Sequence, residues 1–179
     1  MIFTEARLPG AYLVGLEQIE DERGFFARTA AEDEFARIGV DGRFVQWSIS
    51  YNRLAGTLRG MHWQVEPHGE TKLVRCVHGA IYDVIVDIRR ESSGFGSWLG
   101  VDLDAKSRRA LLIPPGFAHG FQTRTDDAEV LYGITPAYVA EAARGFRWDD
   151  PAVGVEWPAA EHRVISERDR ALPLLSDAA

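Results

Sequence analysis

The feature that most constrains this chain is a series of short stretches, rich in β-branched and aromatic residues, that are separated by glycine, proline and serine turns. Six of them predict strands at residues 44–50, 72–78, 81–89, 98–103, 109–113 and 129–135. Before the C-terminus only residues 31–38 resemble a helix, which would end at Gly39. Crossover helices of a parallel sheet are missing, so the sequence predicts an all-β antiparallel jelly roll with a few short helices.

Length and charge restrict the function classes. The 179 residues suit a single domain spanning the chain, with a core over about residues 2–175. No apolar run approaches the ~18 residues of a membrane helix, and no secretory signal is visible at the start. Twenty basic against twenty-seven acidic residues give a net charge of -7, which argues against nucleic acid or an anionic membrane as partner. The one cysteine, Cys76, is expected to be a small buried residue in a reducing, cytoplasmic compartment.

The most unusual cluster is Leu-Arg-Gly-Met-His-Trp-Gln at residues 58–64. In a regular strand Arg59 and His62 point to opposite faces, but a bulge at Gly60 would bring both to one side. The alternative makes His62 a hydrogen-bonded core histidine and Arg59 a surface charge.

A second cluster is the glycine-proline corner at residues 113–121. Its Pro114, Gly116 and His119 match the Pro-x-Gly-x-x-His element that recurs in cupin barrels. In the alternative interpretation the prolines and glycines form a tight turn, and His119 packs between Phe117 and Phe121.

Metal-binding cupins usually carry His-x-His in the first cluster, but Gln64 occupies the second histidine position here. Glu66, His68 and Glu70 stand close by, which leaves an incomplete ligand set. The sequence therefore predicts no catalytic metal. A metal-dependent cupin oxygenase, using the two cluster histidines with Glu66 or Glu70, is the competing hypothesis.

Two polar residues are expected to point into the barrel. Lys72 shares a strand face with Val74 and Cys76, where a lysine is costly unless it meets an anion or an acid; otherwise it is a strand-edge lysine that discourages aggregation. Tyr132 also faces inward, and a core tyrosine with a satisfied hydroxyl is the commoner outcome.

Near the C-terminus, Ser166 and Asp169 have the Ser-x-x-acid spacing of a capping box. This spacing predicts a short helix from residue 166 to about 172, before Pro173 stops it. Capping alone would account for Asp169.

Together these segments resemble the dTDP-4-dehydrorhamnose 3,5-epimerase family of nucleotide-sugar epimerases over about residues 2–175. The resemblance rests on Arg-Gly-x-His at 59–62 and on Pro-x-Gly-Phe-Ala-His-Gly-Phe at 114–121. Asp-Glu-Arg-Gly-Phe-Phe at 21–26, Lys-Leu-Val-Arg at 72–75 and Gly-Phe-Arg-Trp-Asp-Asp-Pro at 145–151 continue it in family order.

The resemblance implies a cupin-type homodimer that acts on a nucleoside-diphosphate 4-keto-6-deoxyhexose without metal or cofactor. His62 would be the general base, with Asp169 orienting it, Tyr132 the acid on the opposite face, and Lys72 the stabiliser of the enolate. An N-terminal strand would cross to the partner and place a binding arginine in its pocket. The implied substrate-binding residues are Arg23, Gln46, Arg59, His119, Tyr138 and Arg168.

The implied chemistry is consistent with the residue types. A proton beside a ketone is lost only if the oxyanion is stabilised, which a lysine ammonium in a dry barrel does. Imidazole side chains titrate near neutral pH, which suits a general base. A C4 ketone acidifies both C3 and C5, so the sequence leaves open inversion at one carbon or at both.

The chain departs from the family pattern mainly away from this chemistry. Family members commonly have a glutamate at Arg28, an acid-asparagine pair at Trp47 and Ser48, a glutamate at Ala143 and a lysine at Arg168. Several of these positions line the nucleotide end in the family. CDP- or GDP-linked substrates are therefore alternatives to dTDP-4-dehydro-6-deoxyglucose, and a non-catalytic sugar-nucleotide-binding cupin is a third hypothesis.

Overall fold

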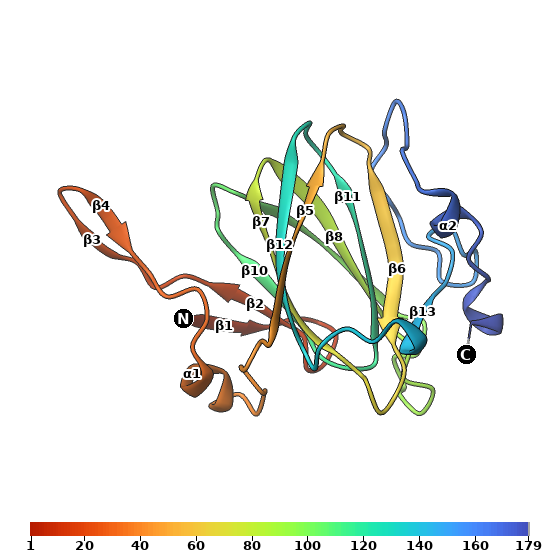
Figure 1. The fold of residues 1–179 in the computed structure, drawn as a ribbon, viewed down its shortest axis with the longest axis horizontal. Coiled ribbons are helices and arrows are strands. Elements are labelled where there is room, and N and C mark those ends of the chain that lie inside the picture. The colour runs from red at the N-terminus through yellow and green to blue at the C-terminus, as the bar shows by residue number, and fades with distance from the viewer. Residues whose placement is uncertain (179) are drawn as a thin grey trace.

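The computed structural model describes residues 1–178. Its two large antiparallel sheets face each other (Figure 1). The first sheet has six strands, in the order β1 (Ile2–Glu5), β2 (Tyr12–Gly15), β10 (Ala110–Ile113), β7 (Thr71–His78), β12 (Ala128–Thr135) and β5 (Gln46–Asn52). The second has five, in the order β13 (Ala143–Gly145), β6 (Leu58–Gln64), β11 (Phe117–Thr123), β8 (Ala80–Asp87) and β9 (Trp98–Asp104). The predicted all-β jelly roll of the cupin type is confirmed.

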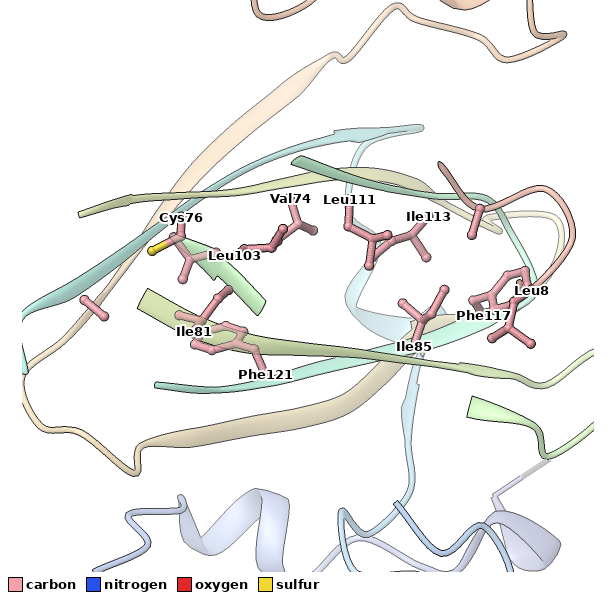
Figure 2. Close-up of a cluster of buried hydrophobic side chains, with 13 residues drawn as sticks. Leu8, Val74, Cys76, Ile81, Ile85, Leu103, Leu111, Ile113, Phe117 and Phe121 are labelled. Atoms are coloured by element: carbon pink, nitrogen blue, oxygen red, sulfur yellow. The ribbon is translucent and has the colours of Figure 1, made fainter. Parts of the chain in front are cut away.

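The core forms because side chains alternate between the two faces of each strand. On β8, Ile81 and Ile85 point between the sheets, while Val84 and Val86 pack on the outer face under the C-terminal segment. Figure 2 shows Val74 and other side chains of the first sheet meeting those of the second in this core. Cys76 is a buried free thiol there, as expected, and burial raises its pKa to about 11.

Each of the six predicted strands is present, with ends that lie within two residues of the expected positions. The glycine-proline corner was only partly predicted correctly, because its turn ends at Gly116 and Phe117–Thr123 form strand β11. His119 is therefore a strand residue between two neighbouring strands, and it does not merely pack beside a turn. The first four strands and β13, all three or four residues long, gave no strand signal.

The helices are short. In α1 (Glu32–Ala36), Phe35 is fully buried against Leu73 and Leu112 on the outer face of the six-stranded sheet. The predicted C-terminal helix is present as α2 (Glu167–Arg170), one turn long, with two 3-10 turns, η1 (Ala140–Ala142) and η2 (Leu175–Asp177), elsewhere. None of the helices within residues 1–178 is long and apolar enough to cross a membrane.

Strands β3 (Ile19–Asp21) and β4 (Gly24–Phe26) form a hairpin, here called the arm, that projects away from the barrel (Figure 1). Its Ile19 and Phe26, which are cross-strand partners, are 69% and 68% exposed, and adjacent exposed apolar side chains of this size mark an interaction surface. The Arg108 guanidinium stacks on the Phe25 ring at 4.8 Å. The arm thus presents two large apolar side chains that the described residues, 1–178, leave uncovered.

Candidate active site

A β-bulge in β6 shapes the site. Two residues of β6, Gly60 and Met61, stand opposite one residue of β11, Gly120. Gly60 has a φ of 120°, and a Cβ there would lie 2.6 Å from the Gly120 Cα, so only glycine fits. Arg59 and His62 are three residues apart, and with the bulge between them both face the same cleft, as predicted.

The inward-facing polar residues line two adjoining pockets of about 350 and 320 Å³ between the sheets. Both pockets share four residues, which are His62, Lys72, Tyr132 and Arg168. The first continues along Gln46, Ser48, Gln64, Glu70, Tyr138 and Ala143, and the second along Ser50, Arg59, His119, Phe121 and Asp169. Nine of the ten sequence-predicted site residues therefore line one cleft.

His62 is held by a carboxylate from the C-terminal segment. Its Nε2 lies 2.8 Å from Asp169 Oδ1, and the Gly60 N–H donates to Asp169 Oδ2 at 3.3 Å. Ser166 Oγ accepts the Asp169 N–H at 3.1 Å, so the predicted capping role and the contact with His62 are both present. Burial acts to raise the pKa of Asp169, but the hydrogen bond and charge of His62 outweigh it, and the pKa of Asp169 is lowered.

A second histidine–carboxylate pair lies deeper in the barrel. His119 Nε2 is 2.7 Å from Asp83 Oδ1, and Asp83 is fully buried on β8, where its Oδ2 has no hydrogen-bond partner among the described residues. Sequence reasoning missed Asp83. The signal was available, because an acid between Ile81 and Ile85 on one face of an apolar strand needs a buried partner.

Lys72 faces into the cleft from β7, a central strand, so the strand-edge alternative is wrong. Its Nζ donates to Glu70 Oε1 at 2.9 Å and to the His62 carbonyl at 3.3 Å. Tyr132 lies on β12, the neighbour of β7, and so belongs to the wall opposite His62. A base and a hydroxyl thus face the same space from two sheets.

The remaining cleft residues form its polar rim. Arg59 Nε donates to Asn52 Oδ1 at 2.8 Å, and Gln46 Oε1 accepts the Tyr138 N–H at 3.2 Å. Of the positions that depart from the family pattern, Ser48, Ala143 and Arg168 line the cleft. Trp47 and Arg28 do not, because Trp47 lies on the outer face of β5 and Arg28 pairs with Glu34 at 3.6 Å.

Arg23 is the one sequence-predicted site residue outside the cleft. It lies in the turn of the arm, with its side chain 85% exposed, and pairs with Asp21. Its role in binding stays a prediction.

The two carboxylates considered as metal ligands are not paired with the cleft histidines. Glu70 lines the cleft but contacts Lys72, Glu66 is exposed, and each cleft histidine has its own aspartate. Within residues 1–178 no group of three or more His, Cys, Asp or Glu is arranged to hold a metal ion.

Two imidazoles, an ammonium and a phenol converge on one cleft of this cupin-type barrel, and this set of groups is typical of an enzyme that works by general acid–base catalysis. The chain belongs to the dTDP-4-dehydrorhamnose 3,5-epimerase family, whose sequence profile matches residues 5–177.

Individual relatives support the assignment. The dTDP-4-dehydrorhamnose 3,5-epimerase of Sinorhizobium fredii is 38% identical over 177 residues, which cover 99% of this chain and 91% of that protein. The crystal structure of the enzyme of the same name from Elizabethkingia anophelis has a TM-score of 0.95 and 34% identity, covering 99% and 97% of the two chains. The dTDP-6-deoxy-D-glucose-3,5-epimerase of Legionella pneumophila, in complex with dTDP-4-keto-L-rhamnose, has a TM-score of 0.92 and 33% identity, covering 98% and 93%.

Proposed function

We propose that the protein converts dTDP-4-dehydro-6-deoxyglucose to dTDP-4-dehydrorhamnose by inverting C3 and C5 of the sugar. The observation that carries this proposal is the placement of His62 and Tyr132 on opposing walls of one cleft, with Lys72 on the same wall as Tyr132 and lining the same cleft. Inversion of a carbon centre requires loss of a proton from one face and its return on the other. Two walls with one proton-transfer group each meet that requirement.

In the proposed mechanism His62 removes the proton beside the C4 ketone, and the electrons of the broken C–H bond move onto the ketone oxygen. The Lys72 ammonium stabilises the resulting enolate oxygen inside the cleft. Tyr132 then donates its phenolic proton to the opposite face of the same carbon. Asp169 keeps the His62 imidazole oriented and favours its protonated form after abstraction.

The second pair has a binding role in this proposal. His119 is held through Nε2 by Asp83 and lines the cleft, where its other ring nitrogen, Nδ1, forms a hydrogen bond with the sugar. Arg59 and Arg168 supply positive charge toward the diphosphate, and Gln46 and Tyr138 contact the base.

Proton NMR of dTDP-4-keto-6-deoxyglucose incubated with the protein in deuterated water tests the function. We expect both the C3 and the C5 proton signals to disappear. Loss of the C3 signal alone would establish a 3-epimerase and overturn the double inversion. With no exchange, the CDP- and GDP-linked sugars are tested next, and silence there together with tight binding would favour the non-catalytic alternative.

The Tyr132→Phe variant tests the assignment of the two walls. We expect His62 to continue washing deuterium into the substrate, while inversion falls by about a hundredfold because the returning proton has no donor. Loss of exchange and inversion to the same degree would contradict the assignment. Activity that disappears with a chelator and returns with iron or manganese would favour the metal-dependent alternative.

We also propose that the protein is a homodimer in which the arm of one chain reaches the partner's cleft. In support, the exposed Ile19 and Phe26 of the arm match the exposed apolar face of β5, formed by Trp47, Ile49 and Tyr51. In that arrangement Arg23 binds the substrate held by the other chain. Sedimentation that gives only a 20.0 kDa species would contradict the dimer.

Mixed dimers test whether Arg23 acts across the interface. Chains carrying Arg23→Ala and chains carrying His62→Ala are unfolded, mixed and then refolded together, so that mixed dimers form. If Arg23 acts on the partner's site, each mixed dimer contains one site with both residues intact, and activity rises on mixing. If it acts within its own chain, mixing restores nothing.

We infer that the protein works in the cytoplasm. The inference is supported by the unpaired thiol of Cys76 in the core, which is typical of reducing compartments. Fractionation of cells that express the tagged protein tests it.

A further inference from the structure

Glu70 is a buried carboxylate with no part in the mechanism described above. It immediately precedes β7, and its side chain is 8% exposed. Both of its oxygens are bonded, because Oε1 accepts from Lys72 Nζ at 2.9 Å and Oε2 accepts from Gln64 Nε2 at 3.1 Å. A buried, fully hydrogen-bonded carboxylate has little freedom to move.

Gln64 fixes the side on which Glu70 is held. The Gln64 Oε1 accepts the Val139 N–H at 2.6 Å, and its Nε2 also donates to the His68 carbonyl at 3.3 Å. Because a backbone N–H requires the amide oxygen, the amide nitrogen must point toward Glu70. Gln64 and Glu70, which we call the bracket, thus form a rigid support behind Lys72.

Lys72 depends on this support. Within residues 1–178 its ammonium is the only cation within hydrogen-bonding distance of Glu70, and its other bond is to the neutral carbonyl of His62. With Lys72 only 9% exposed, loss of the carboxylate would leave a nearly buried positive charge without a counter-ion. The same flexible side chain would also lose the contact that fixes its direction.

We propose that Glu70 is a positioning residue that keeps the Lys72 ammonium aimed at the reacting ketone, with Gln64 holding Glu70 in place. The proposal rests on the function proposed above, because it acts through the enolate-stabilising lysine. The other titratable groups that line both pockets with Lys72 are His62 on β6, Tyr132 on the neighbouring strand β12 and Arg168 on α2. Of the groups around the ammonium, only Glu70 pairs with it as an anion.

Two variants separate charge from reach. In Glu70→Gln the shape is kept and the charge lost, so we expect kcat at pH 8 to fall by about tenfold, with KM nearly unchanged. In Glu70→Asp the charge is kept but the side chain is too short to hold the ammonium in the same place, so kcat should fall here as well, again with KM nearly unchanged.

Glu66→Gln is the matched control, because Glu66 is an exposed acid four residues earlier in the sequence. This substitution should leave kcat unchanged. Thermal unfolding of each variant shows whether the fold is retained. If Glu70 acts through Lys72, adding Glu70→Gln to Lys72→Met should cause no further loss of deuterium exchange.

The outcomes distinguish this inference from the function on which it rests. If the wild-type protein exchanges no deuterium, the proposed function fails. If the wild-type protein does exchange deuterium, but Glu70→Gln folds and keeps the wild-type kcat, the bracket has no role in the reaction. A loss in Glu70→Gln that is equally large in the Lys72→Met background would also overturn the proposal, because Glu70 would then act independently of Lys72.

Discussion

The two histidine–carboxylate pairs of this barrel have nearly the same length and very different surroundings. His62 and Asp169 are 2.8 Å apart at the mouth of the cleft, where the His62 side chain is 39% exposed. His119 and Asp83 are 2.7 Å apart deeper in the barrel, where the side chains are 11% and 0% exposed. Similar contacts thus suit different tasks, since a base must reach the substrate while a binding group must stay fixed.

The origin of the two carboxylates differs as well. Asp83 comes from a central strand, where the sheet itself holds it in place. Asp169 comes from a one-turn helix capped by the Ser166 side chain, and it reaches His62 across a contact between distant parts of the chain. The outer pair, His62–Asp169, therefore depends on the C-terminal segment for its carboxylate, whereas the inner pair, His119–Asp83, lies on two neighbouring strands of one sheet.

Replacing each histidine in turn should give the largest difference in activity between the two pairs. We expect His62→Asn to lower kcat for deuterium exchange by about a thousandfold, because the general base is lost. His119→Asn should cost about tenfold, mainly in KM, because one hydrogen bond to the substrate is lost. Steady-state kinetics by NMR measures both, and equal losses in kcat would show that the pairs share the chemistry.

Replacing each aspartate in turn should give the opposite ranking for stability, with the larger effect at the His119–Asp83 pair. Asp83→Ala should lower the free energy of unfolding by about 3 kcal/mol, because it breaks a fully buried pair inside the barrel. Asp169→Ala should cost only about 1–2 kcal/mol, because its site is nearer the surface. Urea unfolding followed by tryptophan fluorescence measures the difference, and a larger cost at Asp169 would contradict the comparison.

Acid should weaken the outer pair in a predictable direction. The pKa of Asp169 is lowered in the folded protein, so its pairing stabilises the fold above the ordinary carboxyl pKa of about 4 and is lost as pH falls below it. The stability difference between the wild type and Asp169→Asn should thus shrink as the pH falls below about 4. A difference that grows over that acid range would contradict this assignment.

The smallest effect is expected at the cap. Ser166→Ala removes the acceptor of the Asp169 N–H and should cost about 1 kcal/mol of stability. Because Asp169 then orients His62 less firmly, kcat should fall several-fold while KM stays the same. The neighbouring Glu167→Gln, exposed and on the same helix, is the control that should change neither quantity.

Strand prediction from the sequence succeeded where β-branched and aromatic residues formed long stretches, as in β7, β8 and β12. It failed for β11, where Gly116 and Gly120 resemble turn residues, and for the arm, where strands of three residues contain too little pattern to detect. The bulge at Gly60 was predictable because glycine is the residue that such a backbone requires.

The site was less accessible to pattern reasoning. Asp169 fits a helix cap as well as a catalytic partner, and only the resemblance to the epimerases assigned it to His62. Glu70 was weighed as a metal ligand because its charge was visible and its contact with Lys72 was not. Partners that meet across two sheets lie far apart in the sequence, so spacing alone does not pair them.

The bulge in β6 also has a meaning in terms of chain length. Deleting Gly60 would leave Arg59 and His62 on the same face by ordinary alternation, so the side chains alone do not need it. What the extra residue adds is a main-chain N–H outside the ladder, and that N–H donates to Asp169. A gain or loss of one codon at this point would therefore decide whether the outer pair has a backbone anchor, with every side chain of the site unchanged.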